Sequence, residues 1–423
     1  MYIFVHLFHD LSVAYFFIYL VQIESCKYKI VVFVFLIDQL FASKYMNRFL
    51  FLLLNLTFVA CVVSEETKPV KVFILAGQSN MEGKGKIDPL LNHQIEALDT
   101  KDFFAHFHKG GEYIKRNDVW INYLDRRGDL TVGYGSPGCI GLELQFGHIM
   151  GNHYEEPVLL IKTAWGGKSI GRDFRPPSSG APSKESIDQL VENLIKRDYN
   201  KIIRGELNKA KRDNPKITRK DVEAKSNESL DKIRKAKKEE YHKQVLDSYG
   251  YFYRLMMTEI KTTLSEMKLR FPDYDGRGYE IAGFVWFQGW NDMYGDLPGE
   301  YAKNMENLIR DVRKELGVPR LPIAIGVMGQ NGFKPAKGNM AIVKKAQLSM
   351  NDILDFKGNV KAIPTDIYWD KRADEAFPTW RDNLQEWVKI GSDFPYHYLG
   401  STITFTRIGQ ALAQTVLELR AEK

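Results

Sequence analysis

Cysteine is scarce in this chain. Its 423 residues contain three cysteines, Cys26, Cys61 and Cys139. Only Cys139 would remain in a mature chain that begins after Ser64, so a framework of internal disulfides is excluded for such a chain. This cysteine content is compatible with export and does not require it.

A strong excess of charge of one sign is also missing. The formal net charge is +6, and Lys and Arg are interleaved with Asp and Glu along the sequence. We therefore expect no nucleic-acid partner. The apolar fraction of 44% and the aromatic fraction of 13% instead indicate a globular protein of one large domain or two ordinary ones.

The first 45 residues lack an apolar run of membrane-spanning length. The two apolar pieces, residues 11–23 and 30–43, are short for a full span. We interpret residues 1–45 as an extension that precedes the true start of translation at Met46. The alternative is an N-terminal membrane anchor.

Residues 46–64 have the features of a secretory signal peptide. Met46-Asn47-Arg48 provides a short positive region, and the apolar run "LFLLLNLTFVACVV" and small residues follow it. We predict a secreted or periplasmic protein whose mature chain begins near residue 65. Membrane contact would arise only from an uncleaved N-terminal segment or from a lipid anchor on Cys61.

The rest of the chain alternates between strand-like and helix-like patterns. Helical patterns such as "GLELQFGHIMGNHY", "YAKNMENLIRDVRKEL" and "TRIGQALAQTVLELR" lie between or after the apolar runs. This alternation predicts a doubly wound α/β sheet, in which ligands bind beyond the carboxyl ends of the strands. The expected parallel strands are the apolar runs 70–77, 156–164, 279–289, 321–329 and 359–366.

Two stretches interrupt the alternation. Residues 82–140 are rich in Gly and aromatic residues, and we expect them to form a long rim with turns in "RRGDLTVGYGSPG". Residues 184–248 are strongly charged and helix-forming, with breaks expected at Pro215 and Asn227. We interpret this second stretch as a solvated helical insertion, and a partner-binding arm is the alternative.

The run "VFILAGQSNM" ends in a turn with one hydroxyl group, that of Ser79. Ser79 could cap a helix, or it could be a nucleophile that an adjacent base activates. His397, in "SDFPYHYLGS", could be that base, and a carboxylate such as Asp393 could orient it.

The loops after the second and third strands could supply the groups that stabilise an oxyanion. Candidate donors are the backbone N–H groups of Ser79 and Gly167 and the side-chain amide of Gln288 or Asn291. Because parallel strands bring their carboxyl ends to one edge, these groups can converge with His397. The pattern favours acyl transfer by a serine hydrolase.

The motifs "GQSNMEG", "GGKS", "WFQGWND" and "HYLGS…IGQALA" resemble the carbohydrate acetylesterases of the SGNH-hydrolase superfamily, which include sialate O-acetylesterases and acetylxylan esterases. The resemblance covers roughly residues 70–420 without the insertion. It implies a flavodoxin-like three-layer α/β/α sandwich with a five-stranded parallel sheet, Ser79 as nucleophile and His397 as base. It implies no metal or organic cofactor.

The sequence departs from the family pattern at two positions. The family usually has the triad Asp three residues before the His, where this chain has Phe394. Asp393 is therefore our candidate acid, with Asp366 and Asp370 as alternatives. Asn291 stands where the family often has an acidic residue, so the choice between Gln288 and Asn291 as oxyanion donor stays open.

We expect residues 65–423 to form an esterase domain that removes O-acetyl groups from sialic acid or an acetylated polysaccharide. The alternative is a non-catalytic carbohydrate-binding relative that uses the same cleft. Glu143 is interpreted as a first-turn acid that favours its helix. Trp165, Trp286 and Trp290 flank the expected site and could either stack on sugars or pack against the sheet.

Overall fold

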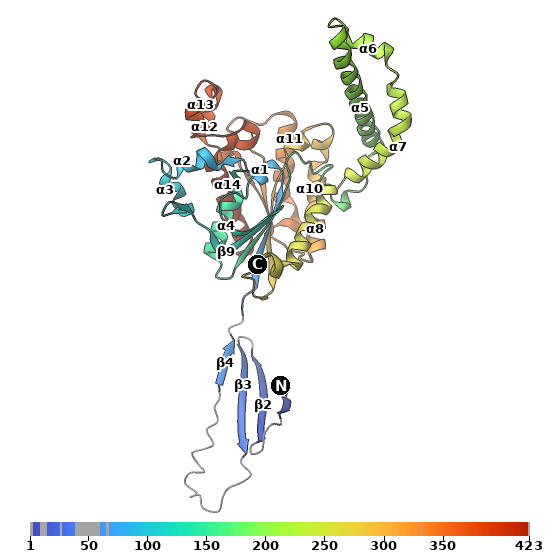
Figure 1. Ribbon diagram of the computed structural model, residues 1–423. Helices are drawn as coiled ribbons and strands as arrows, with labels where there is room; N and C mark the ends of the chain where they lie inside the picture. The colour runs from blue at the N-terminus through green and yellow to red at the C-terminus, as the bar shows by residue number, and fades with distance from the viewer. Residues whose placement is uncertain are drawn as a thin grey trace, which may run out of the picture. The chain divides into compact units, whose positions relative to one another are not determined.

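The computed structural model describes residues 67–330 and 332–421 in full (Figure 1). The chain divides into two compact units, Met1–Lys68 and Pro69–Lys423. In the first unit, the structure describes the strands β1 (Ile3–Phe8), β2 (Tyr15–Ser25), β3 (Tyr28–Asp38) and β4 (Ala60–Ser64), which pair antiparallel in this order. Apart from β4, the expected signal peptide of residues 46–64 lies outside the described residues.

The second unit is built on one seven-stranded sheet. The five strands expected from the sequence are present, and they pair parallel with one another. Their near-continuous apolar sequences suit strands that are covered on both faces. The order across the sheet is β10 (Arg126–Leu130), β9 (Arg116–Tyr123), β12 (Val158–Ala164), β5 (Val70–Gly77), β13 (Tyr279–Phe287), β14 (Ile323–Val327) and β15 (Val360–Pro364).

The turn-rich rim expected for residues 82–140 is partly wrong. Arg116–Tyr123 forms β9, a sixth parallel strand, and β10 pairs antiparallel with it to close that edge. The sequence does not predict β9 because only its last five residues are buried, so its apolar run is short. The following "TVGYGSPG" does form turns, as expected.

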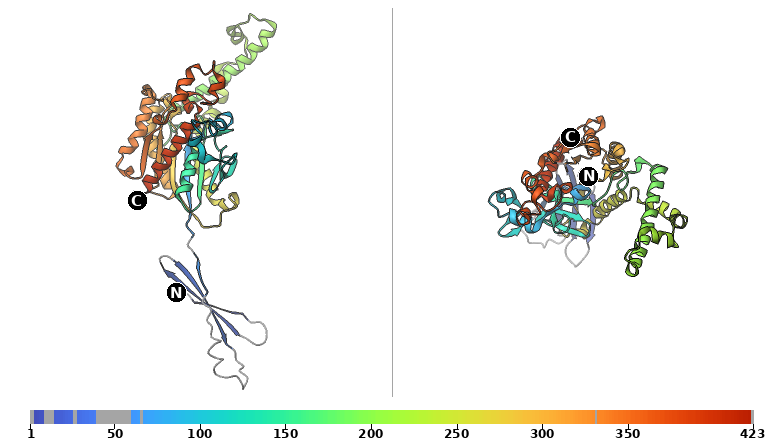
Figure 2. Two further views of the ribbon diagram at one scale, coloured as in Figure 1. Left: turned by 90° about the vertical axis from the view of Figure 1, so that its left-hand side faces the viewer. Right: turned by 90° about the horizontal axis from the view of Figure 1, so that it is seen from above.

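Helices cover both faces of the sheet, which gives the three-layer α/β/α sandwich (Figures 1 and 2). Side chains alternate along β5, so Val72 and Ile74 pack on one face and Phe73 and Leu75 on the other. The first face is covered by α8 (Tyr251–Ser265), α10 (Leu297–Leu316) and α11 (Gly338–Leu348), and the second by α4 (Leu142–His153) and α14 (Thr402–Ala421).

The charged insertion is a helical arm with a small core of its own. It contains α5 (Lys184–Asp213), α6 (Arg219–Lys225) and α7 (Leu230–Ser248). The loops between these helices contain Pro215 and Asn227, the two residues at which breaks were expected. Each helix begins with a side-chain cap, from Ser183, Thr218 and Ser229 respectively. The apolar contacts between α5 and α7 are made by Ile187, Val191, Ile195, Ile233, Tyr241 and Val245.

The remaining elements are short and surround the sheet. Across the described residues, no helix is long and apolar enough to cross a membrane. The short elements are α1 (Ser79–Glu82), α2 (Asn92–Gln94), α3 (Lys101–Phe104), α9 (Met267–Arg270), α12 (Lys371–Ala376) and α13 (Leu384–Trp387), with the strand pairs β6 (Gly85–Lys86)–β11 (Cys139–Ile140) and β7 (His108–Lys109)–β8 (Glu112–Tyr113).

Candidate active site

The strand order brings the candidate residues to one edge of the sheet. β5 lies between β12 and β13, and the loops that follow these three strands carry Ser79, Gly167, and Gln288 with Asn291. The winding direction of the sheet reverses beside β5, which is where ligands bind in open α/β sheets. At this edge a Cβ on Gly77 would meet the Phe287 carbonyl oxygen at 2.1 Å, so only Gly allows the two strand ends to approach so closely.

Ser79 is the first residue of α1 and is 7% exposed. Gln78 occupies the N-cap position of this helix, and no side chain caps it, so Ser79 does not serve as a cap. The Ser79 backbone N–H lies in the first turn, where N–H groups have no intrahelical partner. The next residue, Asn80, donates from Nδ2 to the Tyr396 carbonyl oxygen at 3.1 Å, which ties the Ser79 turn to the loop of His397.

His397 lies in a short helical turn, Pro395–Gly400, that is fastened to the same edge. The buried Tyr398 hydroxyl accepts the Gly329 N–H at 2.8 Å and lies 2.6 Å from Thr365 Oγ1, just beyond the ends of β14 and β15. Tyr398 and Leu399 both have positive φ angles, 52° and 59°. Such strain in non-glycine residues persists only where the surroundings hold it in place, and it clusters at functional sites.

Asp393 is the carboxylate that contacts His397, with 3.0 Å between Asp393 Oδ2 and His397 Nδ1. Burial alone would raise the pKa of Asp393, but the hydrogen bonds from His397 and from the Phe394 N–H outweigh burial and hold the pKa below its usual value. The structure does not bring Asp366 or Asp370 to His397. Asp366 pairs with Lys344, and Asp370 accepts hydrogen bonds from the Arg372 N–H and the Ser401 hydroxyl.

A network of side-chain amides joins the ends of β5 and β13. Gln78 Oε1 accepts from Gln288 Nε2 at 3.1 Å and from the Gly289 N–H at 3.2 Å, and Gln78 Nε2 donates to Asn291 Oδ1 at 3.2 Å. Gln288 Nε2 has two further acceptors, the Lys168 carbonyl and Asp292 Oδ2. Gln288 is 2% exposed, so its amide has no N–H left for a substrate.

Asn291 has its oxygen engaged and its amide nitrogen available. Because Gln78 donates to Asn291 Oδ1, the Nδ2 group must point away from Gln78. Asn291 Nδ2 has no acceptor within residues 67–330 and 332–421. The geometry thus distinguishes the two amides that sequence analysis left open.

Asp292 fixes the loop after β12 against the loop after β13. It is fully buried, and its carboxylate accepts the Ile170 N–H at 2.9 Å, the Gly171 N–H at 2.8 Å and Gln288 Nε2 at 2.6 Å. Burial raises the pKa of Asp292 to about 7 despite these three hydrogen bonds.

Glu82 holds the Gly166–Gly167 turn beside α1. Glu82 Oε1 accepts the Gly166 N–H at 2.6 Å, and Oε2 accepts from Lys84 Nζ at 2.8 Å and from Ser136 Oγ at 3.1 Å. Gly167 has a φ of +70°, is exposed and has open space around its Cα. Within residues 67–330 and 332–421 the Gly167 N–H has no hydrogen-bond acceptor, so it is available to a ligand.

A buried ion pair supports this turn from below. Lys162 on β12 donates to the Glu82 carbonyl oxygen at 2.7 Å and to Glu143 Oε2 at 2.8 Å, and both charged side chains are buried. Glu143 also accepts the Gly141 N–H at 2.8 Å, so it braces the start of α4 and does not reach the cleft. Burial lowers the pKa of the Lys162 amine.

A cleft of about 420 Å³ opens beside Gly167 and Asn291. One wall of this cleft is made by the first turns of α5, including Ser186, Gln189 and Leu190. The lining does not include Ser79 or His397.

The three tryptophans that flank the expected site differ in burial. Trp286 is completely buried and belongs to the core. Trp165 is partly buried and packs against Phe174 and Phe252, and Trp290 lies 5.9 Å from the exposed ring of Tyr396. Of the three, Trp290 is the one placed next to the His397 loop.

Four residues of the site had no role predicted for them from the sequence. They are Gln78, Asn80, Glu82 and Asp292, and each connects two loops at the edge of the sheet. The signal for three of them was their place inside "GQSNMEG", next to Ser79. In the parts of the chain that the structure describes, no group of three or more His, Cys, Asp or Glu side chains forms a candidate metal site.

Among solved structures, a protein from Arabidopsis thaliana at 1.6 Å resolution has a TM-score of 0.44 and 17% identity, over 83% of this chain and 98% of its own. A carbohydrate acetylesterase from Xanthomonas citri has a TM-score of 0.41 and 12% identity, over 93% and 62%. NanS has a TM-score of 0.33 and 13% identity, over 73% and 80%. No curated protein sequence matches the chain.

One family model matches residues 69–210 and 227–368, and it is described as carbohydrate esterase, sialic acid-specific acetylesterase. The match includes most of the arm, which corrects our expectation that the insertion stands outside the resemblance, and it ends before His397. Because the two segments make up more than half of the sequence, this chain belongs to that family of carbohydrate esterases.

Proposed function

We propose that this esterase removes O-acetyl groups from a carbohydrate, either sialic acid or an acetylated polysaccharide, by a Ser-His-Asp mechanism. The observation that carries the proposal is the 3.0 Å contact between His397 and Asp393, on a loop that Asn80 fastens to the Ser79 turn. A histidine held beside a serine at the end of a strand is the arrangement that activates a hydroxyl group.

In the first half of the reaction, Ser79 Oγ attacks the acetyl carbonyl carbon. An imidazole that donates its Nδ1–H to Asp393 has Nε2 available to take the Ser79 proton. The described residues contain no hydrogen bond between Ser79 Oγ and His397, and such bonds often close only when substrate binds. The C–O bond to the sugar then breaks, and His397 returns the proton to the sugar oxygen.

The negative charge on the carbonyl oxygen needs fixed donors. We assign this role to the backbone N–H groups of Ser79 and Gly167 and to Asn291 Nδ2. Asn291 is favoured over Gln288 because three acceptors already lie within hydrogen-bond distance of the two N–H groups of Gln288 Nε2. In the second half, water attacks the acetyl-Ser79 ester with His397 as base, and acetate leaves.

Acetate release from a panel of O-acetylated sialic acids, xylan and other polysaccharides tests the proposed activity. Wild-type protein should release acetate from at least one of them, and Ser79→Ala should lose on the order of 10⁴-fold in kcat. A Ser79→Ala protein that keeps a tenth of the wild-type rate would refute the mechanism.

We further propose that the protein is exported through the signal peptide at residues 46–64 and works on extracellular or periplasmic carbohydrate. The apolar run after Met46-Asn47-Arg48 supports this proposal. N-terminal sequencing of the mature protein should find a start near residue 65, and a chain that begins at Met1 or Met46 would argue for an anchor.

A further inference from the structure

One face of α5 runs from the cleft along the arm. Asn193 lines the cleft and also a shallow hollow farther along the same helix. Residues three or four positions apart share a helix face, and 18 residues at 1.5 Å each span about 27 Å. This α5 face consists of Ser186, Gln189, Leu190 and Asn193 at the cleft and Lys196, Arg197, Asn200, Lys201 and Arg204 beyond it.

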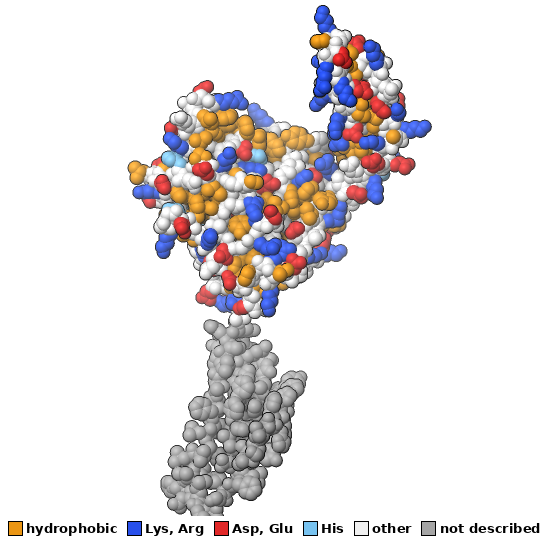
Figure 3. All heavy atoms as spheres, viewed as in Figure 1, with side chains coloured by type: hydrophobic (Ala, Val, Ile, Leu, Met, Phe, Trp, Pro, Cys, Tyr) orange, Lys and Arg blue, Asp and Glu red, His pale blue; other side chains and the backbone are white. Residues whose placement is uncertain are grey.

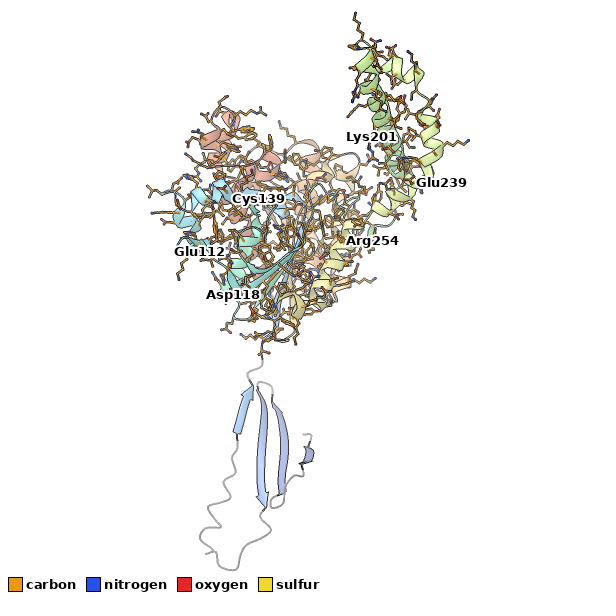
Figure 4. The ribbon with its side chains drawn as sticks, in the orientation of Figure 1. Glu112, Asp118, Cys139, Lys201, Glu239 and Arg254 are labelled. Atoms are coloured by element: carbon orange, nitrogen blue, oxygen red, sulfur yellow. The ribbon has the colours of Figure 1, made fainter. Side chains whose placement is uncertain are left out.

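The outer half of the α5 face is cationic and carries no carboxylate. Lys196, Lys201 and Arg204 are exposed, and among the residues that the structure describes none of them forms an ion pair. Figure 3 shows Lys and Arg side chains along the α5 edge of the arm, and Figure 4 marks Lys201 on α5 and Glu239 on α7.

The acidic residues of α5 that could neutralise this charge are turned toward α7 instead. Glu192 accepts from Arg234 at 2.7 Å, and Asp198 accepts from Lys237 at 3.2 Å. Asp198 also pairs with Arg197 at 3.4 Å, so Arg197 is partly neutralised, whereas Lys196, Lys201 and Arg204 form no ion pair among the described residues.

We propose that the α5 face binds an anionic polysaccharide chain and guides it into the cleft. This inference rests on the proposed function, because a polysaccharide guided into the cleft beside Gly167 and Asn291 would there lose its acetyl groups. Carboxylate groups repeated along a polymer match a row of cations at helical spacing. The α5 face has no aromatic side chain on which a nucleobase could stack, which favours a polysaccharide over a single-stranded nucleic acid.

The test compares two variants with the same change in charge. The face variant is Lys196→Gln/Lys201→Gln/Arg204→Gln, and the control variant removes three exposed lysines of α7, Lys235→Gln/Lys238→Gln/Lys243→Gln. Rates are measured on partly O-acetylated polygalacturonate, on neutral acetylated mannan and on 4-nitrophenyl acetate.

We expect the face variant to raise KM for polygalacturonate about tenfold, as three weak surface contacts would. KM for mannan and the rate on 4-nitrophenyl acetate should stay as in wild type, and the control variant should match wild type throughout. The difference should vanish at about 1 M salt, where the Debye length is about 3 Å. Equal effects of both variants, or an equal effect on mannan, would overturn the proposal.

Direct binding separates this inference from the proposed function. The Ser79→Ala protein should bind partly O-acetylated polygalacturonate without releasing acetate from it, and the added face substitutions should weaken that binding about tenfold. Loss of acetate release from every substrate, with this binding intact, would refute the esterase mechanism and still support the α5 face. Tighter binding of poly(U) RNA to the same face would overturn the polysaccharide proposal.

Discussion

Replacing Asp393 by Asn tests the geometry of the site most finely. Asp393 Oδ1 accepts the Phe394 N–H at 2.6 Å, while Oδ2 faces His397 Nδ1 at 3.0 Å. In Asp393→Asn the amide oxygen should stay on the Phe394 N–H, because that donor has no other acceptor on its loop. The amide NH₂ group then faces Nδ1 and forces the His397 proton onto Nε2, where it blocks removal of the Ser79 proton.

We therefore expect kcat to fall by roughly 10³- to 10⁴-fold, the scale seen when the orienting Asp of a triad becomes Asn. KM should change little, because Asp393 stabilises the protonated imidazole of the transition state and does not bind the sugar. Initial rates on one acetyl ester, with circular dichroism to check folding, give both quantities.

Asp366→Asn and Asp370→Asn are the matched controls. The first loses an ion pair with Lys344. The second keeps a side-chain oxygen that can cap α12, because Asn and Asp are comparable N-cap residues. Neither should lower kcat of the folded protein by more than a few fold. A near-normal kcat of Asp393→Asn, together with a strongly reduced kcat of Asp366→Asn or Asp370→Asn, would refute the reasoning. A near-normal kcat of all three variants would mean that the site works as a Ser-His pair.

Three further outcomes are expected. Glu82→Gln should lower kcat by up to about 10²-fold with little change in KM, because the substitution loosens the turn that presents the Gly167 N–H. An unchanged kcat would show that Glu82 does not contribute to catalysis. Burial raises the pKa of Asp292 from 3.8 to about 7, so the folded protein keeps a proton that the unfolded chain releases between about pH 4 and 7. Stability should therefore fall by ~4 kcal/mol more across that range in wild type than in Asp292→Asn, and equal slopes in urea unfolding would contradict this. Joining the ends of the arm after removal of residues 184–248 should preserve hydrolysis of small esters, since the arm supplies one wall of the cleft and none of the catalytic groups; loss of soluble protein would show that the sheet needs the arm.

The sequence predicted the central strands because their apolar runs are nearly continuous. Strands β5, β12 and β14 and the last six residues of β13 are buried almost throughout, and this burial leaves a clear signal. At the edge of the sheet, β15 is only partly buried. β9 was missed because its first residues are only partly buried, and β10 because "RRGDL" reads as a turn.

The candidate site was predictable in its residue types but not in its hydrogen bonds. The segments that carry Ser79 and His397 are joined by the hydrogen bond from Asn80 to the Tyr396 carbonyl oxygen. The choice between Gln288 and Asn291 depends on which amide nitrogen is already hydrogen-bonded in the folded protein. Gln288 Nε2 donates to Gln78 and Asp292, whereas Asn291 contacts Gln78 through its oxygen. Such a choice is made by tertiary contacts of residues about 200 positions apart, and spacing along one sequence carries no trace of it.

Trapping the acetyl-enzyme tests the central claim most directly. Wild-type protein is mixed with excess acetyl ester, quenched in acid within the first turnovers, and digested for peptide mass spectrometry. We expect the peptide that contains Ser79 to carry one acetyl group, and the same peptide from a Ser79→Ala protein to carry none. Acetate release by wild-type protein without any acetyl group on Ser79 would contradict the account.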